Sequence, residues 1–402
     1  MAALHPSVRR LGWVSFLNDA ASEMIYPMLP AFLATLGATP LTLGALEGFA
    51  EATASLVRVF SGRLSDRRVP KKPLIVAGYL VSNLVRPLIA LVTGPLLVIV
   101  LRVIDRLGKG LRSAPRDALI AAVTPREDRG HAFGFHQGMD HWGGVVGPLL
   151  ASGLLLLPWF DPRRVFLFTL VPGVLCVALT LVLAEPTEGG SAPDETRGEV
   201  PKPRPLGAPF WRFLAVQSVF SLAATSDTFL LLRAQGLGVP IALVALLWAV
   251  HNGIRALFSR WGGRRSDRVG RRRSLITGWV VYAITYAGFA LAATPAAAVL
   301  LFLFYAGYFA MTDGAEKAFV ADLSDATNRG FAFGMSQGTS GVMLLVANLL
   351  MGLVWTRFGP EEAFFLCAFA SASPPCCCGS WFPSRRGRHA PLKCCARGPE
   401  SP

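Results

Sequence analysis

The chain has 402 residues, of which 52% are hydrophobic and only 16% are charged, and its mean hydropathy is +0.47. A soluble domain usually has about 25% charged residues, so this composition excludes an ordinary soluble protein and indicates an integral membrane protein. The net charge of +14 does not indicate nucleic-acid binding. Lys and Arg gather in a few short loops between apolar runs, as the positive-inside rule expects.

The apolar runs predict an all-α protein of twelve transmembrane helices, since a span needs roughly 20 apolar residues. We place them at about 11–34, 41–62, 73–92, 95–122, 131–157, 164–184, 210–233, 240–261, 274–292, 296–321, 331–356 and 362–382. Basic residues follow helices two, four, eight and ten, whereas the loops near 35–40, 93–95 and 292–295 have none. This bias predicts a multi-pass protein of the cell membrane with its N-terminus in the cytoplasm.

A stretch rich in Pro, Gly and charge at 185–209 is typical of a flexible linker. It divides the chain into an N-terminal six-helix bundle at 1–184 and a C-terminal six-helix bundle at 210–382, followed by an atypical tail at 383–402. Pro374 and Pro375 are expected to break the twelfth helix. Five of the seven cysteines lie at 376–378 and 394–395, a pattern that favours a shifted reading frame or a degenerate terminus over a zinc-binding tail.

Two short sequences recur at the same place in each half. G-R-L-S-D-R at 62–67 returns as G-R-R-S-D-R at 263–268, and R-G-H-A-F-G at 129–134 returns as R-G-F-A-F-G at 329–334. Both pairs are separated by about 200 residues, which indicates an internal duplication. Parallel six-helix halves imply a pseudo-twofold axis along the membrane normal, with a substrate path between them.

With these repeats the chain resembles the major facilitator superfamily over nearly its whole length. In that family the Gly and Asp-Arg loop helps to lock the two bundles in one state. The resemblance therefore implies gating roles for Gly62, Asp66, Arg67, Gly263, Asp267 and Arg268. The alternative is that the basic residues of the loop only anchor to lipid headgroups. The first copy departs from the family pattern, because Val69-Pro70 stands where a Gly is expected.

Two helix motifs extend the resemblance. The spacing of Gly134, Gly143, Gly147 and Pro148 is similar to the antiporter signature in the family's fifth helix, which favours export. The alternative is ordinary tight packing, which small residues allow in any membrane helix. Arg102 corresponds to the family's fourth-helix Arg, which the family ties to proton transfer.

The fourth predicted helix carries one stripe of cations at spacings of 4, 3, 3 and 4 residues: Arg102, Arg106, Lys109, Arg112 and Arg116. A charge at the bilayer centre costs about 2.5–3.5 kcal/mol on the mildest scale. The upper cations should therefore face the bundle interior or a water-filled cavity. Arg112 and Arg116 are expected to snorkel to the cytoplasmic surface.

Charged residues inside the other predicted helices provide further candidates for a substrate or proton path. With the stripe, the set of candidate cavity residues is Asp19, Glu23, Glu47, Glu51, Arg58, Arg86, Arg102, Asp105, Arg106, His136, Asp140 and Asp227. They could form structural ion pairs, such as Glu51 with Arg58 or Asp105 with Arg102. Asp19, Glu23, Glu51 and Asp140 could instead couple protons, because a desolvated carboxylate takes up a proton that an approaching Arg drives off again. A hydrogen-bonded packing role competes with titration for His136.

These observations predict a secondary transporter that works by alternating access on a proton gradient, without another cofactor or a metal. No catalytic or nucleotide-binding motif stands out, so an enzyme is not expected. The solute could be a drug or metabolite that is exported, or an anion carried by the Arg-rich N-terminal bundle. A non-transporting receptor or scaffold is a third possibility. The expected partners are a small-molecule substrate and membrane lipid, with the protein a monomer that binds no nucleic acid.

Overall fold

The computed structural model describes residues 4–66, 70–125, 128–183, 205–324 and 328–381. Within these ranges every regular element is a helix. In chain order the elements are α1 (Pro6–Ile25), the 3-10 helix η1 (Tyr26–Met28), α2 (Leu29–Thr35), α3 (Pro40–Asp66), α4 (Lys71–Leu88), the 3-10 helix η2 (Ile89–Leu91), α5 (Pro95–Ala122), α6 (Arg129–Leu155), α7 (Pro162–Phe168), α8 (Leu170–Leu181), α9 (Ala208–Ala223), α10 (Asp227–Gly236), α11 (Ile241–Val269), α12 (Arg271–Leu291), α13 (Pro295–Asp322), α14 (Arg329–Phe358) and α15 (Pro360–Trp381).

These elements form the twelve predicted spans, since η2 directly continues α4 and three further spans are broken into consecutive pieces: α1 to α2, α7 to α8, and α9 to α10. The first break coincides with Pro27 and Pro30, which remove backbone donors from the helix. In the third, Ala224 and Ser226 leave the helical conformation and become extended. Side chains at both breaks reach the other half, since the hydroxyls of Tyr26 and Ser226 lie 3.1 Å apart.

Proline and glycine mark several helix ends. Helices α5, α13 and α15 each begin at a proline, whose missing N–H costs nothing in the first turn. Thr294 caps α13, because its hydroxyl accepts a 3.2 Å hydrogen bond from the N–H of Ala297. Gly359 joins α14 to α15 at φ +111°, a conformation that L side chains rarely adopt. The turns before α5, α13 and α15 are thus short and are encoded directly by the sequence.

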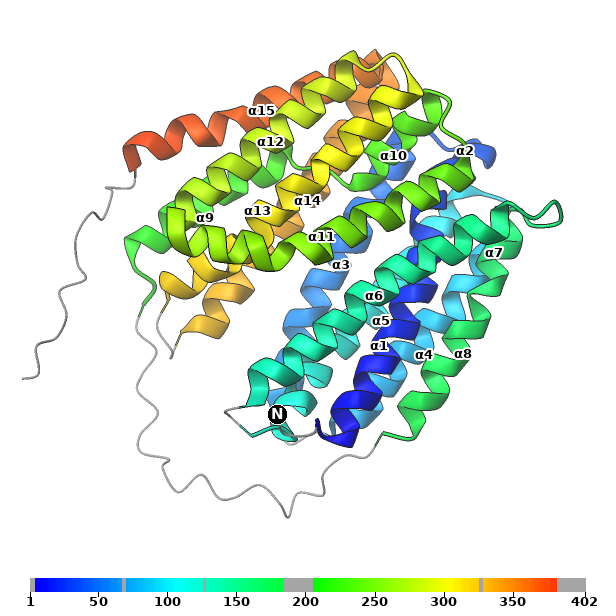
Figure 1. Cartoon of the computed structure of the whole chain (residues 1–402), viewed down its shortest axis with the longest axis vertical. Helices are drawn as coiled ribbons and strands as arrows, with labels where there is room; N and C mark the ends of the chain where they lie inside the picture. Colours follow the sequence, from blue (N-terminus) through cyan, green and yellow to red (C-terminus); the bar gives the residue numbers. More distant parts are fainter. Residues whose placement is uncertain (1–3, 67–69, 126–127, 184–204, 325–327, 382–402) are drawn as a thin grey trace, which may run out of the picture.

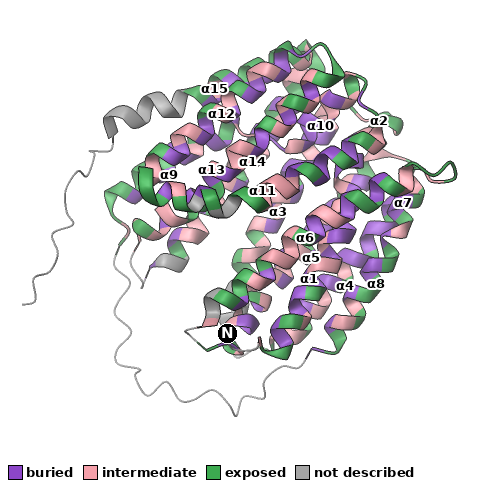
Figure 2. Cartoon of the chain, viewed as in Figure 1, coloured by how far each residue is buried: buried purple, intermediate pink, exposed green. Residues whose placement is uncertain are grey.

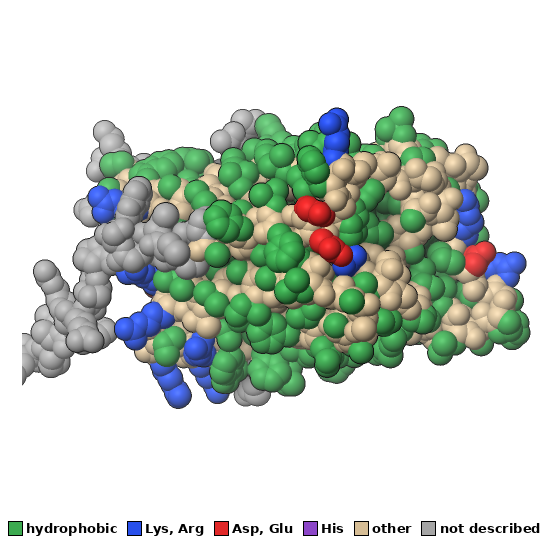
Figure 3. Space-filling view, turned by 90° about the horizontal axis from the view of Figure 1, so that it is seen from above, with side chains coloured by type: hydrophobic (Ala, Val, Ile, Leu, Met, Phe, Trp, Pro, Cys, Tyr) green, Lys and Arg blue, Asp and Glu red, His purple; other side chains and the backbone are tan. Residues whose placement is uncertain are grey.

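The surface of the molecule is suited to lipid. Figure 3 shows a face on which hydrophobic side chains predominate and charged ones are few. Figure 2 shows buried and intermediate residues turned toward the interior of each bundle, with exposed residues on the outside. Seven spans of the described ranges are long and apolar enough to cross a membrane by length and composition alone. Helices α1, α3 and α5 are not among them, and these carry several charged residues each.

The two six-helix bundles meet through two pairs of helices, α3 with α14 and α6 with α11. A Cβ at Gly44 of α3 would collide with the carbonyl of Asn348 in α14, so only glycine permits this approach. Ser152 of α6 donates a 2.9 Å hydrogen bond to the carbonyl of Ala242 at the start of α11. Figure 1 shows the bundles close together at the end away from the N-terminus and diverging toward the end that carries it.

The twelfth helix corrects one prediction. The backbone of α15 remains helical through Pro374 and Pro375 to Trp381, so the predicted break is wrong. Prolines are tolerated in membrane helices where other groups take up the freed hydrogen bonds. Most of the predicted linker and the predicted tail at 383–402 lie outside the described residues, and the domain boundaries stay predictions.

Candidate functional site

Two adjoining cavities lie between the bundles, with volumes of about 590 and about 500 Å³. The same residues of α1, α5 and α11 line both and so join them: Glu23, Arg106, Lys109, Trp248 and Arg255. We call the larger cavity the basic lobe and the smaller one the aromatic lobe, after their other side chains. Asp117 and Lys317, both exposed, lie at the edge of the basic lobe.

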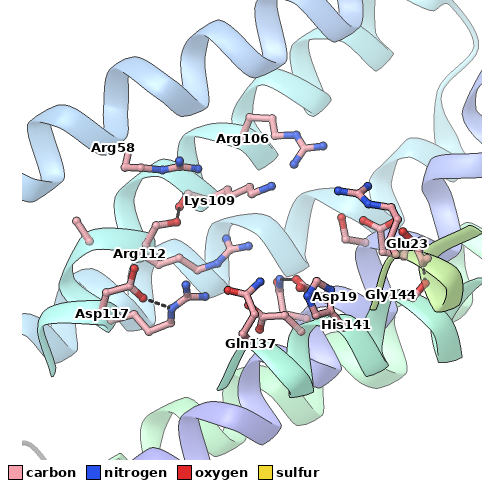
Figure 4. Close-up of a pocket in the computed structure, with 18 of the residues that line it drawn as sticks. Asp19, Glu23, Arg58, Arg106, Lys109, Arg112, Asp117, Gln137, His141 and Gly144 are labelled. Atoms are coloured by element: carbon pink, nitrogen blue, oxygen red, sulfur yellow. Dashed lines mark hydrogen bonds and ion pairs between the residues drawn. The ribbon is translucent and has the colours of Figure 1, made fainter. Parts of the chain in front are cut away.

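The basic lobe is lined mainly by charged side chains of the N-terminal bundle. Eight of its described lining residues are cationic, Arg58, Arg86, Arg106, Lys109, Arg112, Arg116, Arg255 and Lys317, and four are acidic, Asp19, Glu23, Asp117 and Asp140. In Figure 4 the side chains of Arg58, Arg106, Lys109 and Arg112 extend into one space, with Asp19 and Glu23 across it. Since the cations on α5 are three or four residues apart, one face of a single helix supplies half of these cations.

Arg112 does not snorkel to the surface as the sequence predicted. It is 3% exposed and donates to the carbonyl of Gly78 at 3.3 Å and to the hydroxyl of Ser82 at 2.7 Å. Its guanidinium carbon lies 4.6 Å from the centre of the Tyr79 ring. Helix α4 therefore provides two acceptors and an aromatic face, which together offset the cost of burying the charge.

A buried ion-pair cluster lies behind the basic lobe. Asp105 accepts from Arg86 Nε at 3.0 Å and from Arg102 Nη1 at 3.2 Å, and each of the three side chains is at most 2% exposed. Arg86 also donates to the backbone and side-chain oxygens of Asn18, both at 3.0 Å. The cluster ties α4 and α5 to α1. The predicted pair of Asp105 with Arg102 is confirmed, and Arg86 is its closer partner.

Two carboxylates of α1 face the basic lobe without an ion pair. Asp19 accepts a 2.8 Å hydrogen bond from the Asn18 amide, and Glu23 accepts a 2.7 Å hydrogen bond from the indole N–H of Trp248 in α11. In the described part of the chain neither has a cationic group within 4.0 Å. Asp140 lies 3.6 Å from His136 Nδ1, one turn before it on α6.

The aromatic lobe is built by the C-terminal bundle. Its rings come from α9, α11, α12 and α13: Phe213, Phe220, Trp248, Trp279, Tyr282, Tyr305, Tyr308 and Phe309. Phe220 and Trp279 stack with their centroids 4.8 Å apart, and Tyr305 and Tyr308 stack at 5.7 Å. Neighbouring rings fix one another's orientation, so the wall is preformed for a flat, apolar group.

Three carboxylates of the aromatic lobe accept hydrogen bonds from neutral groups. Glu47 accepts from the Ser226 hydroxyl at 3.2 Å, Asp227 from the Tyr305 hydroxyl at 2.7 Å, and Glu316 from the Gln217 amide at 2.6 Å. The first of these joins the two bundles. Tyr26 strengthens the same junction, because its hydroxyl lies 3.1 Å from that of Ser226.

The structure brings most of the predicted cavity residues together. The residues that line one lobe or the other are Asp19, Glu23, Glu47, Glu51, Arg58, Arg86, Arg106, Asp140 and Asp227. Arg102, Asp105 and His136 lie behind them and line neither lobe. The predicted pair of Glu51 with Arg58 does not form; Arg58 donates instead to the Gln337 amide oxygen of α14 at 2.8 Å. The roles assigned to these residues stay predictions.

The glycine motif of α6 has a packing role. A Cβ at Gly143 or Gly147 would collide with the α1 backbone at Phe16 or Ala20, whereas a Cβ at Gly134 would meet nothing within 4 Å. Two of the three glycines thus let α6 approach α1 closely. Pro148 lies inside the helix, directly after Gly147. Close packing explains Gly143 and Gly147 without reference to the direction of transport, but it does not explain Gly134.

The predicted gating residues are described only in part. Asp267 pairs with Arg271, and Arg271 Nε also lies 3.3 Å from Asp322 Oδ2, so the second loop ties the end of α11 to the end of α13. Arg268 is exposed. For Gly62, Asp66 and Gly263 the structure describes only the helical backbone, and Arg67 lies outside the described residues.

Sequence reasoning missed the aromatic lobe as part of the site. Aromatic residues in an apolar helix give no contrast between a cavity face and a lipid face, so no periodic signal reveals Trp279 or Tyr308. Glu316 had a usable signal, because an acidic residue within an apolar span marks a functional site by default. Among the described residues, no group of three or more His, Cys, Asp or Glu is placed to hold a metal ion.

Two six-helix bundles with a lipid-suited surface and a charged cavity between them define a multi-pass membrane transporter. The chain belongs to the Major Facilitator Superfamily, whose family model matches residues 11–258 and 228–388. An uncharacterized MFS-type transporter of Methanocaldococcus jannaschii is 32% identical over 372 residues, covering 90% of this chain and 91% of that protein. Multidrug resistance protein MdtG of Citrobacter koseri is 26% identical over 375 residues, covering 89% and 90%.

Solved structures share the fold at low sequence identity. The nucleoside transporter NupG superposes with a TM-score of 0.72 at 14% identity, over 93% of this chain and 98% of that chain. A bacterial homolog of the human lysosomal transporter Spinster, in an inward-facing and unoccupied conformation, gives a TM-score of 0.70 at 14% identity, over 92% and 93%. With its family established, the protein is a transporter of the plasma membrane.

Proposed function

We propose that this transporter exports an organic solute in exchange for protons by alternating access. The observation that carries the proposal is that Asp19 and Glu23 face the basic lobe with neutral hydrogen-bond partners only. A carboxylate in an ion pair stays ionised. One that faces a cavity without such a pair can take up a proton when the cavity opens to the acidic side, and lose it when a cation approaches.

The link between protonation and conformation runs through Glu23. Its hydrogen bond to Trp248 joins α1 of one bundle to α11 of the other, on the path between the two lobes. A hydrogen bond to a charged acceptor contributes about 1.5–3 kcal/mol, more than one to a neutral acceptor. Uptake of a proton by Glu23 therefore weakens one tie between the bundles and favours their separation at this level.

Other observations support the direction of transport and the orientation of the chain in the membrane. The relative MdtG carries the name multidrug resistance protein at 26% identity, which favours outward movement of foreign or waste molecules. The basic loops follow helices two, four, eight and ten, which favours an N-terminus in the cytoplasm. In that orientation the cavities open toward the cytoplasm, where an exporter takes up its solute. We further propose a monomer that needs no cofactor besides the proton gradient.

Flux measurements in proteoliposomes test the proposal. The purified protein is reconstituted with a trapped pH-sensitive dye and a pH gradient, and organic solutes of each charge are added, including ethidium and naphthylacetate. We expect one or more solutes to move against protons, and Asp19→Asn or Glu23→Gln to abolish the coupling. Glu362→Gln, at an exposed residue of α15, is the matched control and should retain it.

Two results would contradict the proposal. Solute flux that does not depend on the pH gradient would refute the proposed proton coupling. A folded protein that moves no solute in the panel would favour the alternative of a receptor or scaffold. The carrier of an anionic solute remains compatible with proton exchange, and the excess of cations in the basic lobe is the specific observation that favours it.

A further inference from the structure

Cations without ion-pair partners face the junction of the two lobes. Arg106 is 9% exposed, and its Nε is buried without a hydrogen-bond partner. Neither Arg106 nor Lys109 makes an ion pair within 4.0 Å or a side-chain hydrogen bond in the described part of the chain. A buried guanidinium with an open donor is costly unless an acceptor completes it. A bound anion would do so.

The same two cations also line the aromatic lobe, together with Trp279 and Tyr308. Trp279 is stacked on Phe220, and the Tyr308 ring lies 5.2 Å from that of Tyr282. One cavity of about 500 Å³ thus presents cations from the N-terminal bundle and a fixed aromatic wall from the C-terminal bundle. A volume of this size suits a drug-sized molecule rather than an inorganic ion.

We propose that the solute is an aromatic monoanion whose carboxylate binds Arg106 and Lys109 while its ring stacks on the wall around Trp279 and Tyr308. This inference rests on the proposed transport function and names its substrate class. The solute contacts α5 of one bundle and α12 and α13 of the other. It therefore bridges the two halves, and its binding energy is available to draw them together.

Five carboxylates line the aromatic lobe, Glu23, Glu47, Glu51, Asp227 and Glu316, and they bear on the number of charges that the solute carries and on its orientation. Glu47, Asp227 and Glu316 accept hydrogen bonds from neutral donors, so their charge is not cancelled by a cation within 4.0 Å in the described structure. They would repel a second anionic group at the far end of the solute. A monoanion is thus favoured over a dianion, with its charge toward α5 and its ring toward the C-terminal bundle.

Isothermal titration calorimetry on the full chain in detergent tests the substrate class without requiring flux. The probes are naphthylacetate, naphthylacetamide, naphthylethylamine and acetate, which vary the charge on one ring and then remove the ring. We expect naphthylacetate to bind at least tenfold more tightly than the other three, because it alone combines the ring with an anion. The anion completes a charge-assisted hydrogen bond that a neutral amide does not. Tighter binding of naphthylethylamine than of naphthylacetate would overturn the proposal.

Two variants assign the groups. Arg106→Gln should weaken naphthylacetate binding roughly 10- to 100-fold, the value of a hydrogen bond to a charged group, while Arg212→Gln, at an exposed residue of α9, should leave it unchanged. Tyr308→Leu should weaken it about 2- to 10-fold, and Tyr308→Phe, which keeps the ring, should not. If Arg106→Gln fails to fold, Lys109→Gln gives the same test, and unchanged binding in these variants would overturn the assignment.

The outcomes separate this inference from the proposed function. Binding of naphthylacetate without proton-coupled flux would support the site and refute the exchange mechanism. Proton-coupled flux of ethidium in a protein that does not bind naphthylacetate would support the exchange and overturn the substrate class.

Discussion

Trp248 in α11 donates its indole N–H to the carboxylate of Glu23 in α1 at 2.7 Å, although 225 residues separate them in the chain. The bond crosses from one bundle to the other at the point where the basic and aromatic lobes join. The Tyr26 ring lies with its centroid 4.8 Å from that of the Trp248 ring. The indole is therefore held both by the hydrogen bond to Glu23 and by this ring contact. In the proposed proton exchange, protonation of Glu23 alters the contact between the bundles at this pair.

Replacing Trp248 by Phe should shift the protein away from the conformation described here. Phenylalanine keeps an aromatic ring but cannot donate to Glu23, and the lost bond contributes about 1.5–3 kcal/mol. Spin labels at Thr39 and Pro240, both exposed near the end where the bundles meet, should then report a larger population at long distance by double electron–electron resonance. The labels require a background in which the seven native cysteines are replaced.

The matched control for that experiment is Trp261→Phe, an exposed tryptophan on the same helix. It should leave the distance distribution unchanged. A Trp248→Phe distribution identical to that of the parent would mean that the bond contributes nothing to the balance between conformations.

Replacing Asp105 by Asn should strongly destabilise the protein. The change leaves Arg86 and Arg102 buried without their shared counter-ion, and breaking a buried pair in this way costs about 3–5 kcal/mol. Thermal unfolding in detergent, followed by tryptophan fluorescence, measures the loss.

The comparison for this prediction is Asp117→Asn. Asp117 pairs with Arg116 at 3.0 Å, but its side chain is 50% exposed, and exposed pairs contribute about 0–1 kcal/mol. Equal losses in the two variants would contradict the argument that burial makes the Asp105 cluster important.

The sequence was sufficient to predict the spans and the pairing of the halves. Apolar run length located all twelve helices, and the duplicated loops identified the two bundles, because both signals are local in the chain. The stripe on α5 also predicted the charged face of the N-terminal bundle. Helical periodicity gives the face of one helix but not the helix that covers it. The burial of Arg112 was therefore missed, since it depends on α4 offering Gly78, Ser82 and Tyr79.

The parts of the site that join the bundles could not be predicted for the same reason. Nothing in the neighbourhood of Glu23 in the sequence indicates Trp248, and nothing near Glu47 indicates Ser226. Each partner lies on a helix whose position is fixed by packing between α3 and α14 and between α6 and α11. The extended step at Ser226 is also not encoded by a proline or glycine. Ser226 is instead the N-cap of α10, because its hydroxyl accepts a hydrogen bond from the N–H of Thr228. Its contact with Glu47 depends on the packing of α3 and has no local signal.

Replacing Gly147 by Ala should destabilise the protein, whereas Gly134→Ala should not. The added methyl at Gly147 would collide with the backbone of Ala20, and neither helix can move without disturbing the packing of α1 on α6. Overpacking of this kind costs about 1–3 kcal/mol. At Gly134 the methyl has open space, and alanine favours a helix over glycine by about 0.8–1.0 kcal/mol. Thermal unfolding of the two variants should therefore move in opposite directions. If Gly147→Ala instead lowered export and left the unfolding temperature unchanged, Gly147 would have a role in transport rather than in packing.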